Sequence, residues 1–405
     1  MNHQILGAVA LGYTPLIDRQ RMVTATRLTV MPLRPDAKLD ASELLAAVAE
    51  VWPAGGAQVI LNVLSEDLLE SLLRTEPSAN LMIEVPAFMA TDSAHGELLL
   101  ALKKRGTPLL LKGVPSMALT AEIKPCFKFL VLDLDDESRA NTQANTPTNA
   151  GSDPGLPKLQ SGLRSAAAID ASFARGVSGV IGWPMQGVYE APAASGAPVK
   201  AEVQADLQVI VELMSRIDQG EDVERLEQTL KRDPSLAFKL LRYLNSAAFG
   251  LPVEVASFRH AIMLLGYARM KRWLALLLTT ASKDHSMRPI MFAALRRGLL
   301  MEELARDSSD AELRDEMFIC GLFSLLDHML KQPFSKLLQS IPMPERVRQA
   351  LVDESGPFQP YLELVRAVED ASVFDYRSAT EQLMLGAEEV NMCVLRALSK
   401  AAQLE

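Results

Sequence analysis

An aspartate and a histidine stand side by side in an otherwise apolar segment, GLFSLLDHML, at residues 321–330. Carboxylate and imidazole groups are common ligands of divalent metal ions, so Asp327 and His328 are candidates for a metal site. Such a site needs further ligands from other helices, and the chain has only five histidines. The alternative is a polar pair at a helix end or between two helices, and the sequence favours that alternative.

The elements that must position such residues change type along the chain. In the first half, short apolar runs alternate with helical patterns, for which Asp40 and Ser65 are predicted N-caps. Strands separated by helices indicate a mainly parallel sheet, either closed or open. The predicted strands are residues 57–64, 81–88, 107–114, 127–134 and 176–183.

From residue 203 onward the apolar residues recur with helical spacing, so the second half is predicted to be all-α. One helix is expected to start with Asp233 as its cap and Pro234 in its first turn. Further helices are predicted at 268–282, 290–306, 312–330, 344–353, 360–370 and 378–402.

With 405 residues, the chain is too long for a single ordinary core, and two domains are expected. The first is predicted to span residues 1–190 and to contain a flexible loop at 137–160, where Asn, Thr, Gly, Pro and Ser dominate. An Ala- and Pro-rich linker follows at 191–202. The second domain is predicted at 203–405.

The composition excludes several classes of protein. The net charge of −9 argues against nucleic-acid binding, which depends on Lys and Arg. No run of about 18 apolar residues is free of charges or breakers, so no membrane-spanning helix is expected. The N-terminus lacks the basic start of a signal peptide. Cys126, Cys320 and Cys393 are far apart and odd in number, which disfavours disulfides and favours a cytoplasmic location.

The segment 230–274, LKRDPSLAFKLLRYLNSAAFGLPVEVASFRHAIMLLGYARMKRWL, resembles the HDOD domain, a helical relative of the HD-type phosphohydrolases. In catalytic HD proteins a His-Asp metal-binding pair follows a Gly-Leu-Leu sequence. Here Ser324 and Leu325 occupy those positions, and neither is a good metal ligand. Asp327 and His328 lie about one helical turn further on, in reversed order, and cannot replace the pair. The resemblance therefore implies that no metal is bound here.

The first half resembles the EAL-type cyclic-di-GMP phosphodiesterases, in the short form that is fused to HDOD domains. The segment YTPLIDRQRMVTATRLTVMP at 13–32 is similar to the family's opening motif, and four later polar positions are retained. The resemblance implies a TIM-like barrel. The retained residues are Asn62, Glu84, Asp133 and Gln186.

Departures from the EAL pattern affect the metal ligands. Such enzymes hold two divalent ions with carboxylates, which activate a water molecule. Arg27 replaces the signature glutamate, Lys112 lies where two aspartates are expected, and Val131 replaces a catalytic lysine. Ser161 and Arg164 stand where later glutamates are expected. Because cations at these positions repel an incoming metal ion, we expect no hydrolysis of cyclic-di-GMP and no bound cofactor.

Two interpretations of the introduced cations remain. Arg27 and Lys112 could pair with the phosphates of a cyclic dinucleotide that binds without being cleaved. Alternatively, they form ion pairs with Glu84 or Asp133 and fill the mouth of the barrel. The second interpretation is favoured, because the loss of metal ligands is no evidence for a guest.

A basic segment in the second half is a candidate partner surface. Arg259, Arg269, Lys271 and Arg272 could dock an acidic partner or a nucleotide. The alternative is a solvated helix face, favoured because the last three residues do not share one face of a helix. Arg296 and Arg297 are also expected at the surface.

These observations predict a protein of the α/β plus all-α class, in which a degenerate EAL barrel precedes an HDOD domain. We expect a non-catalytic signalling or scaffold protein that acts through contacts with protein partners. The resemblance implies bacterial signal transduction. Two alternatives stay open: a cyclic-di-GMP sensor without turnover, and a residual phosphodiesterase that uses Glu84 and Asp133.

Overall fold

The computed structural model describes most of the chain. Three predicted features lie wholly or largely outside the described residues: the helix start at Asp233 and Pro234, the linker 191–202 and residues 137–153 of the predicted loop. The described residues are 3–35, 37–52, 55–134, 154–186, 205–230, 255, 257–281, 285–337 and 343–404.

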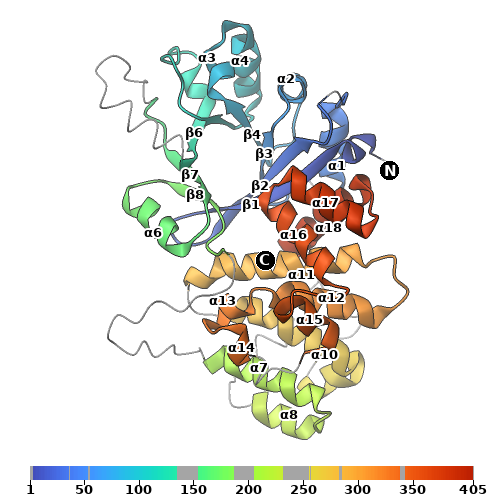
Figure 1. The fold of residues 1–405 in the computed structure, drawn as a ribbon. Helices are drawn as coiled ribbons and strands as arrows, with labels where there is room; N and C mark the ends of the chain where they lie inside the picture. Colours follow the sequence, from blue (N-terminus) through green and yellow to red (C-terminus); the bar gives the residue numbers. More distant parts are fainter. Residues whose placement is uncertain are drawn as a thin grey trace. The chain divides into compact units, whose positions relative to one another are not determined.

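Eight strands form a closed barrel in sequence order (Figure 1). Strands β2 to β8 run parallel to one another, whereas β1 is antiparallel to both β2 and β8. All five predicted strands are present, and the open alternative is excluded. The bounds are β1 (Val9–Ile17), β2 (Val23–Pro32), β3 (Gln58–Val63), β4 (Leu81–Pro86), β5 (Leu109–Lys112), β6 (Phe127–Leu132), β7 (Lys158–Leu163) and β8 (Gly179–Gly182).

The interior of the barrel contains an apolar layer to which every strand contributes one buried side chain. Because side chains alternate between the two faces of a strand, positions two residues away from this layer also face the interior. The functional side chains described below occupy several of those positions. The layer consists of Leu16, Ala25, Ile60, Met82, Leu110, Val131, Leu159 and Ile181.

Two helices of the barrel region begin where the sequence predicted. The Asp40 carboxylate accepts hydrogen bonds from the backbone N–H groups of Ser42 and Glu43, and the Ser65 hydroxyl accepts one from Leu68. These caps satisfy N–H groups that lack partners within the helix. The helices are α1 (Ala41–Val51), α2 (Glu66–Arg74), α3 (Ala87–Thr91), α4 (Gly96–Arg105) and α6 (Ala166–Ala174).

Strands β1, β2 and β7 were not predicted, and β7 overlaps a predicted loop. The first three residues of β7, 158–160, belong to the loop that was predicted at 137–160. The predicted end of that loop was therefore wrong by three residues. The sequence KLQSGL has no continuous apolar run and mixes polar with apolar residues. Its pairing with β6 and β8 overrides the weak local signal.

The second half is helical, as predicted. Two of the predicted helices are each interrupted: 312–330 breaks at Ser324 and Leu325, and 378–402 breaks after Met384, whose φ is +54°. The helices are α7 (Ala205–Asp218), α8 (Val223–Leu230), α10 (Phe258–Ala281), α11 (Arg288–Leu304), α12 (Ala311–Phe323), α13 (Leu326–Leu330), α14 (Phe334–Leu337), α15 (Glu345–Val352), α16 (Gln359–Asp370), α17 (Val373–Leu383) and α18 (Ala387–Leu404).

The chain forms two compact units. Unit 1 comprises Met1–Pro184 together with Arg366–Leu395, and unit 2 comprises Met185–Val365 together with Arg396–Glu405. The end of α16, all of α17 and the first half of α18 therefore belong to the same unit as the barrel. The division into domains at 1–190, 191–202 and 203–405 remains a prediction, because a compact unit and a domain need not coincide. Among the described helices, none is long and apolar enough to cross a membrane.

Candidate functional site

A buried ion pair lies in the barrel beyond the apolar layer. Arg27 on β2 follows Ala25 by two residues, and Glu84 on β4 follows Met82 by two, so both side chains face the interior. The Nε and Nη2 groups of Arg27 donate to the two carboxylate oxygens of Glu84, each at 2.6 Å. The Glu84 side chain is fully buried and that of Arg27 is 14% exposed. This bidentate geometry is the strongest form of an arginine–carboxylate contact.

A second polar group lies on neighbouring strands. Lys112, the last residue of β5, donates from Nζ to the amide oxygen of Asn62 on β3 at 2.8 Å. The amide nitrogen of Asn62 donates to the Thr29 hydroxyl on β2 at 3.2 Å. Asn62 is buried, so its amide is held from both sides. The carboxyl ends of β2, β3 and β5 thus share one chain of hydrogen bonds.

The remaining EAL-like positions are arranged differently. The Val131 side chain is part of the buried apolar layer. The Ser161 hydroxyl on β7 donates to the Leu132 carbonyl oxygen at 3.2 Å. Asp133 and Gln186 are exposed at the ends of β6 and β8. The structure therefore joins Arg27 to Glu84 but leaves the other two retained polar residues at the surface.

The donor set does not fit the pair of divalent ions that the EAL resemblance implies. Both oxygens of Glu84 already accept hydrogen bonds from Arg27, and the Asn62 oxygen accepts one from Lys112. Two cations at this level of the barrel repel a third. Within the described ranges, no three His, Cys, Asp or Glu residues are placed to hold a metal ion.

In unit 2, Ser324, which was predicted to stand in place of the His-Asp pair, provides a hydroxyl. Ser324 ends α12, where its Oγ donates to the Gly321 carbonyl oxygen at 2.6 Å and accepts from Nη1 of Arg297 at 3.0 Å. Arg296 and Arg297 were predicted at the surface, and this was wrong: they are 2% and 8% exposed. Both arginines lie on α11, whose residues from Pro289 to Met301 are all buried.

The Asp327–His328 pair lies on the short helix α13. The Asp327 side chain is buried, and one of its oxygens accepts the backbone N–H of His328 at 2.8 Å. The other oxygen lies 4.0 Å from Nε2 of His328. The pair thus stands at a helix start, as the favoured alternative predicted.

The candidate partner surface is largely engaged within the chain. Lys271 is 8% exposed and contacts both carboxylate oxygens of Asp218, at 2.5 and 2.7 Å. Arg272 pairs with Glu302 at 2.6 Å and with Asp315 at 2.9 Å.

Burial acts to lower the pKa of Arg272, but the carboxylates of Glu302 and Asp315 outweigh it and raise the pKa above its usual value. Arg259 forms an exposed pair with Glu224 at 2.6 Å. Arg269 is exposed. Of the four predicted residues, Arg269 is therefore the one best suited to meet a partner.

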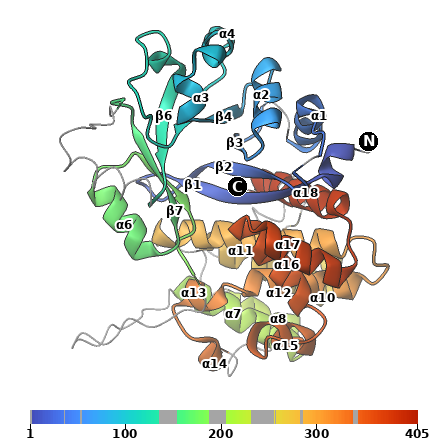
Figure 2. The ribbon, with the colours of Figure 1, turned by 45° about the horizontal axis from the view of Figure 1, so that its top comes forward.

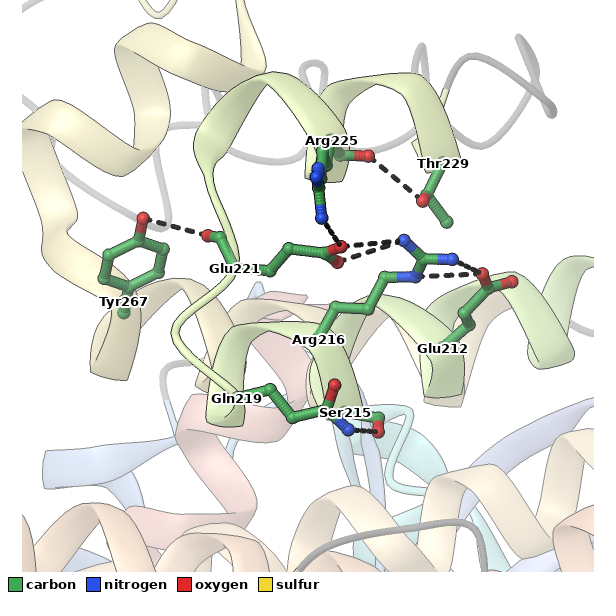
Figure 3. Close-up of polar contacts among 8 residues, drawn as sticks. All are labelled: Glu212, Ser215, Arg216, Gln219, Glu221, Arg225, Thr229 and Tyr267. Atoms are coloured by element: carbon green, nitrogen blue, oxygen red, sulfur yellow. Dashed lines mark hydrogen bonds and ion pairs between the residues drawn. The ribbon is translucent and has the colours of Figure 1, made fainter.

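A further polar network lies at the start of the helical unit (Figure 3). Arg216 donates to Glu212 at 2.6 Å and to Glu221 at 3.0 Å, and the Tyr267 hydroxyl donates to the Glu221 carbonyl oxygen at 3.3 Å. The hydrogen bond to Glu212, followed by that to Glu221, raises the pKa of Arg216. The sequence analysis missed this network, although the four-residue spacing of Glu212 and Arg216 is a recognisable signal.

Comparison with known proteins identifies the helical region. Residues 204–339 match the HDOD domain family. The chain carries an HDOD domain. This HDOD-containing chain is 32% identical over 191 residues to the uncharacterized protein YuxH of Bacillus subtilis, covering 46% of each chain. It is 26% identical over 164 residues to the cyclic di-GMP phosphodiesterase CdgJ of Vibrio cholerae, covering 40% of this chain and 38% of CdgJ. The chain thus spans less than half the length of these relatives.

The N-terminal region matches solved EAL domain structures. The EAL domain of Mycobacterium smegmatis DcpA is 17% identical with a TM-score of 0.31, covering 43% of this chain and 90% of that domain. The FimX EAL domain from Pseudomonas aeruginosa, bound to c-di-GMP, is 13% identical with a TM-score of 0.29, covering 45% and 93%. The predicted order of a barrel followed by an HDOD region is confirmed by the strand topology and the family match.

Proposed function

We propose that this chain is a non-catalytic component of cyclic-di-GMP signalling and acts through contacts with protein partners. The observation that carries the proposal is the bidentate ion pair between Arg27 and Glu84. In this pair, Arg27 donates to both oxygens of Glu84, the buried carboxylate among the retained EAL-like residues. The signalling context is supported by the HDOD match and by the name of the relative CdgJ.

A hydrolysis assay tests the loss of catalysis. The full chain is incubated with cyclic-di-GMP and either Mn²⁺ or Mg²⁺, and we expect no product above the protein-free background. The variant Arg27→Glu restores a carboxylate at the signature position and should also be inactive, because Lys112, Val131 and Ser161 are unchanged. Turnover that disappears both with a chelator and in Glu84→Ala would instead establish the residual phosphodiesterase.

Binding without turnover is less well supported. A phosphate that contacts Arg27 must displace a buried carboxylate, which would then lose its charge-assisted hydrogen bonds. Calorimetry with cyclic-di-GMP should therefore give no heat of binding for the wild-type chain. A heat that is present in the wild type and lost in Arg27→Ala would favour the sensor.

The partner surface is tested by a matched pair of charge reversals. Arg269→Glu changes an exposed side chain and should leave thermal stability unchanged while weakening the capture of an acidic partner. Arg272→Glu places a carboxylate beside Glu302 and Asp315, so in contrast to Arg269→Glu it should lower the thermal stability. If Arg269→Glu leaves the set of captured proteins unchanged, this residue does not contribute to the partner surface.

A further inference from the structure

Strand β1 leaves part of one edge without a strand neighbour. It pairs with β2 along its whole length, but with β8 only through Leu16 and Ile17. Backbone groups along the rest of that edge need other partners, because unpaired buried groups are costly. Pro15, which has no N–H group, occupies one of these positions.

Asn391 on α18 provides partners for this edge. Its amide nitrogen donates to the carbonyl oxygens of Leu6 and Val9, both at 2.7 Å, and its amide oxygen accepts the N–H of Leu11 at 3.0 Å. Tyr376 on α17 donates to the same oxygen at 3.2 Å. Asn391 is completely buried, so one side chain from near the C-terminus replaces a strand neighbour.

The turn between α16 and α17 contacts the same side of the barrel. The Tyr13 hydroxyl donates to the Glu369 carboxylate at 3.4 Å, and the Trp183 indole N–H donates to the Glu369 carbonyl oxygen at 3.3 Å. Arg164 forms an ion pair with Asp370. Because Arg164 and Trp183 directly follow β7 and β8, the turn lies at the carboxyl ends of these strands. Figure 2 shows α18 close to the strands β1 and β2.

Gly12 shows how close this approach is. Gly12 lies four residues before Leu16 and therefore on the same face of β1. A side chain at this position would face the barrel interior. A Cβ on Gly12 would lie 2.8 Å from the Ala371 Cβ and 2.8 Å from the Val368 carbonyl oxygen. The turn therefore stands against the interior side of β1, two residues from the position that pairs with Arg27.

Both ends of α17 have strained backbone. Ala371 has φ of +51° and Met384 has φ of +54°, a conformation that residues with a Cβ seldom adopt. At Ala371, which lies beside Gly12, such strain persists only while the surrounding contacts enforce it, and it is relieved when they are lost.

From these contacts we propose that residues 366–395, the C-terminal clasp, hold the seam between β1 and β8 closed and can detach while the rest of the barrel stays folded. Detachment uncovers the interior side of β1 beside Arg27. Access to the barrel mouth then depends on a segment that follows the HDOD domain in sequence. The proposal goes beyond the proposed function and does not depend on the loss of catalysis.

Native cysteines provide the test. Cys393 lies in the clasp, and Cys126 directly precedes β6; both thiols are buried, and neither belongs to a disulfide. The full chain is treated with a thiol reagent at increasing low concentrations of urea, and each cysteine is followed by mass spectrometry, with rates normalised to the unfolded chain. We expect Cys393 to react faster than Cys126, at a rate that does not depend on urea, as local opening requires. Equal rates that rise together with urea would overturn the proposal.

Two glycine substitutions test the contact itself. Gly12→Ala should raise the Cys393 rate by about tenfold, because the added methyl group overpacks the interface. Gly7→Ala is the matched control, since its Cβ would meet only the Glu388 Cβ at 4.0 Å, and its rate should equal that of the wild type. Equal rates in these two variants would also overturn the proposal.

A second substitution keeps the test decisive if Gly12→Ala fails to fold. Ala371→Gly removes the methyl group that a Cβ at position 12 would meet. In the double variant Gly12→Ala/Ala371→Gly, the Cys393 rate should therefore return part of the way to the wild-type value. Tyr13→Phe removes the hydrogen bond to Glu369, keeps the ring that packs against Trp183, and should raise the Cys393 rate without changing that of Cys126. A Cys126 rate that rises equally in Tyr13→Phe would contradict a separate clasp.

Discussion

In the barrel, an arginine meets a carboxylate; in the helical unit, an arginine meets a hydroxyl. Arg27 and Glu84 occupy positions that the EAL resemblance assigns to the site, and Ser324, which accepts from Arg297, occupies a position where the HD resemblance predicts a metal ligand. The barrel pair carries two opposite charges, one of them fully buried. In the helical unit the acceptor Ser324 is neutral.

This difference determines what each contact contributes. Two charges removed from water stabilise the fold only while each has its partner, because an unpaired buried charge is costly. A hydrogen bond to a hydroxyl contributes much less to the free energy of unfolding, because both groups form hydrogen bonds with water in the unfolded chain. The barrel pair should therefore tolerate the loss of both residues better than the loss of one.

The largest expected effect is that of Arg27→Met. It leaves the Glu84 carboxylate buried without its bidentate partner, and we expect a loss of about 3–5 kcal/mol in the free energy of unfolding. Urea denaturation of the full chain measures this loss. The double variant Arg27→Met/Glu84→Leu should recover most of it, because no buried charge remains. If Arg27→Met were as stable as the wild type, the ion pair between Arg27 and Glu84 would not contribute to the stability of the barrel.

Sequence patterns predicted most of the fold because the informative signals were local. Apolar runs bounded by capping residues located five strands, and Asp40 and Ser65 were identified as caps from their side chains alone. Strand β7 was missed because KLQSGL depends on pairing with its neighbours. The buried Arg297 was assigned to the surface, since nothing in the sequence shows that α12 approaches it closely.

The site was predictable in part. The exchange of a glutamate for Arg27 follows from the motif, and Glu84 was one of two carboxylates expected to pair with it. The choice between Glu84 and Asp133 required the structure, because the register of β2, β3 and β4 sets which side chains meet. The contacts of Asn391 with β1 were beyond any sequence argument, since about 380 residues separate the partners.

A smaller effect is expected for Gly321→Ala. A Cβ on Gly321 would lie 2.4 Å from the Arg297 carbonyl oxygen, so α11 and α12 would have to move apart. We expect a loss of about 1–3 kcal/mol in the free energy of unfolding, measured by urea denaturation. Gly298→Ala is the control, because its nearest contact is 3.0 Å, and it should cost less. A larger loss for Gly298→Ala would mean that the contact around Gly321 is not the tightest point between these helices.

The smallest effect is expected for Ser324→Ala. The change removes the hydrogen bond to the Gly321 carbonyl oxygen and the acceptor for Arg297, and it should cost about 1–2 kcal/mol. The comparison with Arg27→Met is direct, because both variants are measured in the same full chain and each removes one side of an arginine contact. A loss as large as that of Arg27→Met would show that the hydroxyl holds Arg297 as tightly as a carboxylate holds Arg27. The difference in charge between the two acceptors would then not explain the difference between the two units.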